Sequence, residues 1–234
     1  NHWNKKFIFF NEQASYAASL GQVHKGKLVN GELVACKLQY PDMLSTVKAD
    51  LKQLEIILDL FEKYNKAIKT KKIHSEISQR LYEEIDYKKE IYNMGIFKNI
   101  FSDDSNVHIP EVFKKNSTEK LITMSWLEGL PVEQTIRTYN NKKTKERIAK
   151  NIFNAWYKPF YNFAVIHGDP HFGNYSFKKN GDINLFDFGC VRFFPIKFVK
   201  AVLNLIRCSS SFVINIKYLY LHTLSTKIIV DSFH

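Results

Sequence analysis

Cysteine is scarce in this chain of 234 residues: there are three, Cys36, Cys190 and Cys208, and no two are spaced as C-x-x-C. An odd number of thiols without paired spacing is not typical of a disulfide framework or of a zinc site. We therefore expect reduced thiols. Cys36 and Cys190 are expected to pack as small apolar side chains and not to act as reactive groups.

Long apolar runs are also missing. The most apolar late segment, residues 212–230, is interrupted by Lys217, His222 and Lys227, so we expect no transmembrane helix there. No charged-then-apolar leader opens the chain, which begins with asparagine, and we expect a fragment or a processed form. Hydrophobic residues make up 45% and aromatic residues 15%, a composition typical of one large globular domain or of two lobes.

Arginine is scarce as well, at only five positions, although the formal net charge is +11. Readout of base edges and bidentate phosphate contacts both favour arginine over lysine. The lysines are spread along the chain, with small clusters at residues 69–72 and 142–143. We therefore expect no nucleic-acid partner. An anionic membrane surface or a phosphorylated small molecule suits this chain better, and a solvated lysine-rich surface is the simplest interpretation.

The first part of the chain is predicted to form strands and then helices. Residues 19–40 alternate in polarity around Asn30-Gly31, which is the strongest short signal for a β-hairpin. Pro41-Asp42 offers a helix start, and apolar residues at intervals of three and four predict a helix to about residue 61. A second helix is predicted over residues 75–97.

The remainder is predicted to contain a strand, a helix and a second hairpin. KLITMSWLEGLPVEQ is typical of a buried strand that leads into a link near residues 125–132. A helix is predicted over residues 142–158, with Pro159 as its stop or kink. Asn180-Gly181 lies between two strand-like segments and predicts another hairpin. We therefore expect an α+β fold, with a small β-rich lobe and a more helical second lobe.

Polar residues crowd into the stretch VIHGDPHFGNYSFKKNGDINLFDFGC, residues 165–190. One interpretation is a hydrolytic metal site, because His167, Asp169 and His171 alternate and would point to one side of an extended segment. The other histidines show no paired spacing, which argues against it. A second interpretation is a turn-rich loop with capping aspartates and no chemistry.

The third interpretation uses oxygen ligands, which suit magnesium better than zinc. The predicted hairpin folds Asp187 back beside Asn174, so that an aspartate and an amide share one cation. Asp169 is then free to orient or deprotonate a hydroxyl. This is the division of labour that phosphoryl transfer needs. A lone DFG is a weak signal, but HGDPHFGN followed by a hairpin and DFG is specific.

Phosphoryl transfer of this kind also needs a phosphate loop, a strand lysine and an acid to hold the lysine. Residues 14–26 supply small side chains that permit close backbone approach to a ligand. Lys37 lies on the return strand of the first hairpin and would need a partner at an inward position. A lysine on an edge strand facing water is the alternative. Acids follow on the second helix, where Asp86 and Glu90 are expected on one face; a solvated acidic face is the alternative.

Six motifs, AASLGQVH, VACKLQYP, EEIDYKKEIYN, LITMSWLEG, HGDPHFGN and LFDFG, occur in the order seen in the UbiB-like atypical kinases, the AarF/ADCK group. The chain resembles this family from about Ala14 to Phe194. The resemblance implies a two-lobed protein-kinase-like fold, truncated at both ends, with an N-lobe at 1–124, a hinge at 125–132 and a C-lobe at 133–234.

The resemblance also implies a function. The family is linked to ubiquinone (coenzyme Q) biosynthesis and lipid-related metabolism, as an ATPase or unorthodox kinase at membranes. We therefore expect ATP and Mg2+ as cofactors, and an anionic membrane surface or a lipid- or quinone-biosynthesis complex as a partner. The expected location is intracellular, peripheral on a bacterial inner membrane or an organellar membrane.

The resemblance further assigns roles to individual residues. The alanine-rich nucleotide loop corresponds to Ala17, Ala18, Ser19, Leu20, Gly21 and Gln22. The hinge, where backbone groups would meet adenine, corresponds to Met124, Ser125, Trp126 and Leu127. Lys37 would bind phosphates, Glu90 would hold Lys37, and Asp169 matches the catalytic-loop acid. The magnesium ligands would be Asn174 and Asp187, and the family's E-x-D element matches Glu84 and Asp86.

The chain also departs from the family pattern. Tyr16 stands where the family commonly has alanine, and Ala14 where it often has proline; Tyr16 is expected to tighten the loop over the nucleotide or to pack against the lobe. The family's N-terminal K-x-G-Q region does not occur in these 234 residues, and no family motif follows Ile206, so we expect few helices in the second lobe. Two other functions stay open: a nucleotide-responsive binding or scaffold module, and a small-molecule kinase of the aminoglycoside or choline type. The alanine-rich loop argues against the latter.

Overall fold

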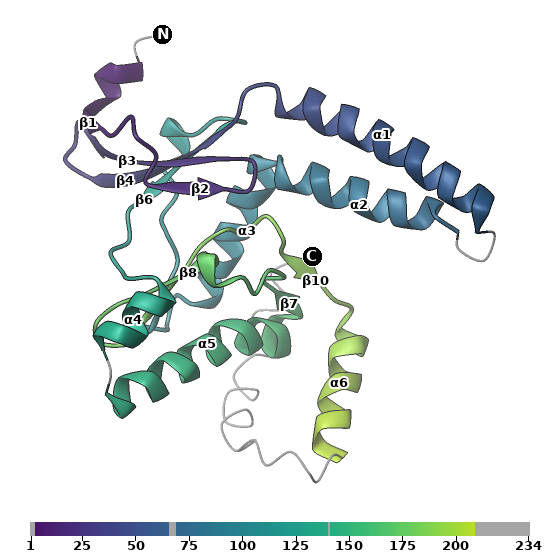
Figure 1. Cartoon of the computed structure of the whole chain (residues 1–234). Helices are drawn as coiled ribbons and strands as arrows, with labels where there is room; N and C mark the ends of the chain where they lie inside the picture. The colour runs from purple at the N-terminus through teal and green to yellow at the C-terminus, as the bar shows by residue number, and fades with distance from the viewer. Residues whose placement is uncertain (1–2, 66–68, 140, 209–234) are drawn as a thin grey trace.

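The computed structural model describes residues 3–65, 69–139 and 141–208, with an antiparallel sheet at one end and a more helical part at the other (Figure 1). The strands of this sheet are β1 (Phe7–Phe10), β2 (Tyr16–Ala18), β3 (Gly21–Leu28), β4 (Leu33–Gln39) and β6 (Leu121–Ser125). Their order is β1-β3-β4-β6, with β2 paired to β3, and all neighbours are antiparallel. The predicted α+β class and the β-rich first lobe are confirmed.

The predicted Asn30-Gly31 turn joins β3 to β4. Gly31 has a φ of 89°, in the left-handed region that glycine adopts without steric cost, and its N–H donates to the Leu28 carbonyl at 2.8 Å. The register of the sheet places Lys37 of β4 between Val23 of β3 and Ile122 of β6. Because β4 has a neighbour on each side, the alternative of an edge-strand lysine is wrong.

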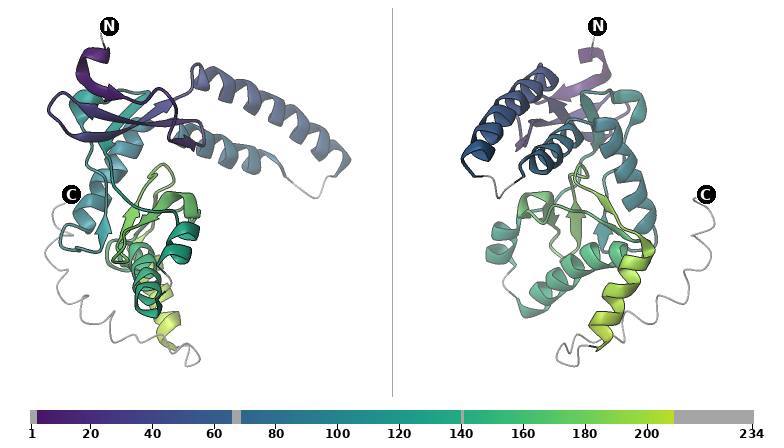
Figure 2. Two further views of the ribbon diagram at one scale, coloured as in Figure 1. Left: turned by 60° about the vertical axis from the view of Figure 1, so that its left-hand side comes forward. Right: turned by 90° about the vertical axis from the view of Figure 1, so that its right-hand side faces the viewer.

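Two helices, α1 (Met43–Tyr64) and α2 (Lys71–Glu84), run side by side and project away from the sheet (Figures 1 and 2). Val47 and Leu51 are the buried residues of α1. The His74 ring of α2 is within hydrogen-bond distance of the Leu51 carbonyl, with Nε2 and O 3.0 Å apart. This contact joins the first turn of α2 to the first half of α1.

The structure corrects the prediction of one helix over residues 75–97. Instead, α2 ends and α3 (Tyr87–Ile100) begins after Asp86. The Asp86 carboxylate accepts a hydrogen bond from the Lys89 N–H at 3.0 Å and so caps the N-terminus of α3. Asp86 therefore lies outside the helix that carries Glu90, and the prediction that both share one helical face is wrong.

The helical part contains α4 (Val132–Thr138), α5 (Lys142–Phe163) and α6 (Ile196–Cys208). Its short strands are β5 (Val107–His108), β7 (Val165–Ile166), β8 (Tyr175–Phe177), β9 (Ile183–Leu185) and β10 (Arg192–Phe193). Short 3-10 helices are η1 (Trp3–Lys6), η2 (Lys114–Asn116) and η3 (Phe172–Asn174). The second predicted hairpin is confirmed as β8 and β9, β5 runs parallel to β9, and β7 pairs with β10.

Helix α5 does not end where its proline predicts. Pro159 lies inside the helix, which continues to Phe163, so the predicted stop is wrong. Proline lacks the N–H that would bond to the carbonyl four residues earlier, which weakens a helix. Here Pro159 is buried, and the ring of the adjacent Phe160 packs edge-on against Phe194 with centroids 5.4 Å apart. Tertiary packing thus offsets the local cost.

One hydrophobic core connects the sheet to the helical part. Phe97 of α3 is fully buried and packs on Phe188, with ring centroids 5.1 Å apart, and Ile122 of β6 and Ile183 of β9 belong to the same cluster. The lobe limits at 124 and 132 stay a prediction. The expectation of few helices in the second lobe rests on the sequence after Ile206, most of which, residues 209–234, lies outside the described residues. Within the described ranges, no helix is long and apolar enough to cross a membrane.

Candidate active site

Lys37, Glu90 and Asp187 come together from three distant parts of the sequence. The Lys37 Nζ on β4 donates to both carboxylate oxygens of Glu90 on α3, at 2.7 and 2.9 Å. Asp187, which follows β9, places its Oδ2 3.3 Å from the same nitrogen. The side chains of Lys37 and Glu90 are only 9% and 4% exposed. The structure therefore forms a buried lysine held between two acids.

Charge and burial act in opposite directions on this lysine. Burial alone lowers the pKa of a lysine, but the charges of Glu90 and Asp187 outweigh burial here and raise the pKa of Lys37 above its ordinary value. The Lys37 ammonium therefore stays charged at neutral pH. Its Nζ also lies 5.5 Å from the centroid of the Tyr87 ring, and burial raises the pKa of Tyr87 to about 12, so this ring stays neutral.

Helix α3 is also connected to the D-F-G turn by a side chain that the sequence reasoning did not single out. Asn93 is completely buried, and its Nδ2 donates to the Phe188 carbonyl at 2.8 Å. Phe188 is itself fully buried against Phe97. The turn that carries Asp187 is thus attached to the helix that carries Glu90.

Asp169 and Asn174 contact each other directly. The Asn174 Nδ2 donates to Asp169 Oδ2 at 2.7 Å, and the His171 N–H donates to Asp169 Oδ1 at 3.1 Å. Both residues are half-buried. Asn174 ends η3, the single turn that brings its amide back toward Asp169. The Asp169 carboxylate is therefore held in position by groups of its own loop.

Two backbone features shape this loop. Gly168 has a φ of 85°, and a Cβ at this position would lie 2.0 Å from the Cys190 carbonyl oxygen, so no side chain fits there. This close approach brings the Asp169 loop against the segment that follows Asp187. Asp187 itself has a φ of 55°, in the left-handed region that is uncommon for a residue other than glycine but in which aspartate is enriched.

Asn174 and Asp187 fit the donor chemistry of a magnesium site. They lie at one end of the β8–β9 hairpin, where the Phe186 N–H donates to the Asn174 carbonyl at 2.9 Å. Mg2+ often takes one or two protein ligands and completes its coordination with water and phosphate oxygens. Within the described residues, no group of three or more His, Cys, Asp or Glu is placed to hold a metal. The carboxylate and amide oxygens of Asp187 and Asn174 therefore match the ligand types of a cation that is bound together with phosphate.

The two histidines of the motif do not face a common metal with Asp169. His167 is buried, with its Nε2 2.9 Å from the Phe186 carbonyl, and burial lowers its pKa. His171 is exposed and accepts a hydrogen bond from the Gly173 N–H at 3.0 Å through Nδ1. The expectation that His167, Asp169 and His171 point to one side is therefore wrong.

The predicted nucleotide loop is a tight hairpin between β2 and β3. Ala17 pairs with Gln22 and Ala18 with Gly21, so that Ser19 and Leu20 form the turn. A Cβ on Gly21 would lie 2.3 Å from the Leu38 carbonyl oxygen, so this glycine permits close contact with β4. The small size of Gly21 therefore permits the close packing of β3 on β4 next to Lys37, in addition to any contact with a ligand.

The predicted hinge covers the end of β6 and the residues directly after it. Met124 is buried, the Ser125 N–H donates to the Glu111 carbonyl at 2.8 Å, and the chain continues through Trp126 and Leu127. The Tyr16 ring at the start of β2 stacks on the Trp126 ring, with centroids 6.1 Å apart and planes at 28°. Tyr16 therefore bridges from the loop strand to the hinge.

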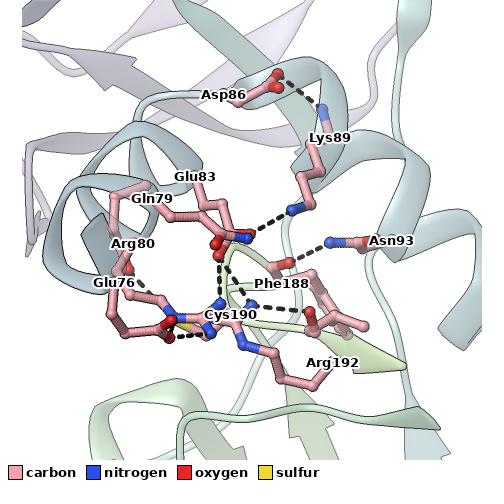
Figure 3. A network of polar contacts seen from close by, with 12 residues as sticks. Glu76, Gln79, Arg80, Glu83, Asp86, Lys89, Asn93, Phe188, Cys190 and Arg192 are labelled. Atoms are coloured by element: carbon pink, nitrogen blue, oxygen red, sulfur yellow. Dashed lines mark hydrogen bonds and ion pairs between the residues drawn. The ribbon is translucent and has the colours of Figure 1, made fainter. Parts of the chain in front are cut away.

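Glu84 and Asp86 of the E-x-D element have different surroundings. Glu84 accepts a hydrogen bond from the Cys190 thiol at 3.3 Å, whereas Asp86 is exposed and caps α3. Burial, together with Glu84, raises the pKa of the Cys190 thiol to about 12, so Cys190 stays protonated. The neighbouring Glu83, which the sequence did not distinguish from the other acids, contacts three cations (Figure 3).

Comparison with known proteins places this geometry in a family. Residues 1–211 match the ABC1 atypical kinase-like domain. "Atypical kinase COQ8, mitochondrial" from Saccharomyces cerevisiae is 29% identical over 199 residues, which cover 85% of this chain and 39% of that protein. "Atypical kinase COQ8B, mitochondrial" from Danio rerio is 27% identical over 209 residues, 89% of this chain and 33% of that protein.

A solved structure shows the same similarity. The structure of an Rv3197–erythromycin complex from Mycobacterium tuberculosis aligns with a TM-score of 0.73 at 28% identity, over 85% of this chain and 51% of that one. The matched part of the chain spans 33% and 39% of the length of the two curated relatives above. With 211 of its residues inside the matched range, the chain belongs to the ABC1 atypical kinase-like domain family, the UbiB/COQ8/ADCK group.

Proposed function

We propose that this domain binds magnesium-ATP and hydrolyses it or transfers its γ-phosphoryl group, in ubiquinone or lipid metabolism. The observation that carries the proposal is the position of Lys37, doubly bonded to Glu90 and 3.3 Å from Asp187. A lysine held by a helix acid beside a metal-binding aspartate is the arrangement with which kinases bind ATP phosphates. Membership of the atypical kinase family supports the same chemistry.

The contacts of each residue of the set support the role that we propose for it. Lys37 stays charged and would bind phosphate oxygens, while Glu90 fixes its direction. Asn174 and Asp187 would hold Mg2+, which neutralises phosphate charge when bound. Asp169 is an acceptor oriented by Asn174 at 2.7 Å, and it would position or deprotonate the attacking hydroxyl or water.

The nucleotide would lie between the β2–β3 hairpin and the hinge. The Ser125 N–H and the Trp126 N–H already donate to the Glu111 and Leu33 carbonyls. Adenine would therefore contact other backbone groups of the hinge residues Met124, Ser125, Trp126 and Leu127, and the hairpin of residues 17–22 would cover the phosphates. Tyr16 and Trp126 already contact each other at this edge. This contact supports the alternative that Tyr16 tightens the loop toward the hinge.

The proposal extends to partners and location. The +11 charge and exposed apolar residues on α1, such as Ile57 and Leu60, suit an anionic membrane surface or a lipid- or quinone-biosynthesis complex. The two relatives described above are both named as mitochondrial. Peripheral association with an organellar membrane is therefore the location we propose.

Turnover separates this proposal from a binding module that uses nucleotide only as a signal. Asp169→Asn should lower the rate of ADP formation from magnesium-ATP by about 100-fold or more, because general-base positioning contributes about that much. Binding of ATP should change little, since Asp169 is not among the proposed ligands. Asp103→Asn, at an exposed position, is the matched control and should keep the wild-type rate. A wild-type chain that binds ATP with no turnover above background would instead favour the binding module.

A further inference from the structure

Glu83 lies where three elements meet. At the C-terminal end of α2, its carboxylate accepts hydrogen bonds from the Arg80 guanidinium of the same helix at 2.9 Å and from Lys89 of α3 at 2.8 Å, and it forms an ion pair with Arg192 of β10, with N and O 3.0 Å apart (Figure 3). Arg80 also contacts Glu76 one turn earlier. One acid therefore connects the α1–α2 helix pair, the first turn of α3 and the strand that follows the D-F-G turn.

The contacts of Glu83 are more shielded than the surface ion pairs of the described residues. The Glu83 side chain is 11% exposed and that of Arg192 is 25% exposed. By contrast, the side chains of the Lys88–Glu119 pair on the outer side of α3 are 72% and 76% exposed. Burial by itself raises the pKa of Glu83, but hydrogen bonds from Lys89 and Arg80 outweigh burial and lower this pKa to about 2. Glu83 therefore stays negatively charged.

The neighbours of Glu83 in sequence and space make these contacts relevant to the candidate active site. Lys89 directly precedes Glu90, the partner of Lys37. Arg192 follows Asp187 by five positions along the chain. Without the Glu83 charge, the cations of Lys89 and Arg192 would face each other without a shared acid and would repel. The two segments that they belong to would then move apart.

We infer that Glu83 is a positioning residue that keeps the start of α3 and the segment after Asp187 in the arrangement that lets Glu90 and Asp187 meet Lys37. The inference rests on the proposed function only in treating these three residues as the nucleotide site. A second contact, from Asn93 to the Phe188 carbonyl, attaches the same two segments further along α3. Glu83 contacts α3 closer to its start than Asn93 does, and because Glu83 belongs to α2 it also connects the α1–α2 helix pair to these segments. Movements of the α1–α2 helix pair would therefore reach the segment after Asp187 through the Glu83 carboxylate, in addition to the contact between Glu84 and the Cys190 thiol.

The accessibility of Lys37 measures this effect in the nucleotide-free chain. We would label the folded protein with a limiting amount of an N-hydroxysuccinimide acetate reagent and follow acylation of Lys37 by peptide mass spectrometry. Exposed Lys52 and Lys88 serve as internal references for reagent activity. In Glu83→Gln, which keeps the size of the side chain, Lys37 should acylate about fivefold faster or more, because local opening exposes it and weakens its pairing with Glu90.

Matched variants separate positioning from general damage. Glu76→Gln removes one acid from the same helix but touches only Arg80, so Lys37 labelling should stay within about twofold of wild type. Arg192→Gln should raise labelling in the same direction as Glu83→Gln, because the ion pair between the two residues is lost in both. The double variant should label no faster than Glu83→Gln alone, because it loses the same ion pair and also the cation that would repel Lys89. If Glu83→Gln does not fold, Arg192→Gln alone gives the same test.

The outcomes are distinct. Unchanged Lys37 labelling in Glu83→Gln and Arg192→Gln, with cooperative melting of both, would overturn the inference. Equal increases in these variants and in Glu76→Gln would also overturn it, because the effect would then be nonspecific loosening of α2. None of these measurements uses nucleotide, so failure of the proposed function, seen as no response of wild type to magnesium-ATP, is recognised separately.

Discussion

Helix α3 contributes one residue to each of two lysine–glutamate ion pairs, which have nearly equal N–O distances but lie in opposite environments. The Lys37–Glu90 pair has N and O 2.7 Å apart and lies in the core, with side chains 9% and 4% exposed. The Lys88–Glu119 pair is 2.6 Å long and faces water. Distance alone would rank the two pairs together. Burial separates them, because water competes for the outer pair and the inner pair has been removed from water.

The comparison shows which of the two ion pairs holds its residues in a fixed geometry. A buried ion pair is costly to assemble and is weak evidence for stability in itself. The inner pair here is accompanied by Asp187 and by a helix start capped by Asp86. The cost of burying this ion pair is understandable if the lysine must point in one direction toward a ligand. The outer pair needs no such explanation.

The largest expected effect comes from breaking the inner pair. Glu90→Gln removes the charge but keeps the shape, and we expect a loss of about 3 kcal/mol in the free energy of unfolding, measured by urea denaturation. The value lies at the low end for a broken buried pair because Asp187 stays 3.3 Å from Lys37 as a second partner. A loss within experimental error would show that the pair contributes no more than a surface contact.

A smaller effect is expected from the buried histidine of the motif. Burial lowers the pKa of His167, against the Phe186 carbonyl and nearby aspartates. Below its ordinary pKa of about 6.5, the unfolded chain therefore binds more protons at this position than the folded chain does. The sign is that the free energy of unfolding falls as the pH falls, by at most about 1.4 kcal/mol per pH unit for one group.

His167→Gln tests this dependence by urea unfolding at pH 7 and pH 5. The decrease between the two pH values should be smaller in the variant than in wild type. The pKa of Glu83 is lowered to about 2 in the folded chain. The stability that this carboxylate contributes is therefore present at pH values above the pKa of a glutamate in the unfolded chain, and it is lost only as the pH falls below that pKa. Glu83 thus does not contribute to the difference between pH 7 and pH 5. An identical decrease in both proteins would mean that His167 does not titrate between the two states.

The smallest effect is expected from the outer pair. Lys88→Gln should leave the urea midpoint unchanged within error, because both partners are largely exposed and screened by water and salt. The variant alters the same first turn of α3 as Glu90→Gln and so serves as its control. A loss comparable to that of Glu90→Gln would remove the contrast between the two pairs.

The sequence allowed the family, the α+β class and both hairpins to be predicted, because short motifs and turn residues are local signals. The Asn30-Gly31 turn needs only the conformational freedom of its own residues. The Lys37–Glu90 contact was predictable through the resemblance, which supplied a pairing between residues far apart in the chain.

Features that depend on tertiary structure were not predictable in this way. Apolar periodicity continues across Asp86, so the end of α2 was not visible in it. Pro159 reads as a helix stop unless the packing around it is known. Glu83 looks like the other acids near it, because its partner Arg192 is distant in sequence. The stacking of Tyr16 on Trp126 likewise needs the folded sheet.

The measurement that tests the central claim most directly is a thermal-shift titration with ATP, with and without magnesium, on wild type and Asp187→Asn. A ligand that binds only the folded state adds about 2.7 kcal/mol at a hundredfold excess over its Kd. We expect a magnesium-dependent rise in the melting temperature of wild type and loss of the magnesium dependence in Asp187→Asn, with cooperative melting kept. Equal nucleotide binding by the variant with and without magnesium, at wild-type strength, would contradict the assignment, as would a flat response from cooperatively melting wild type.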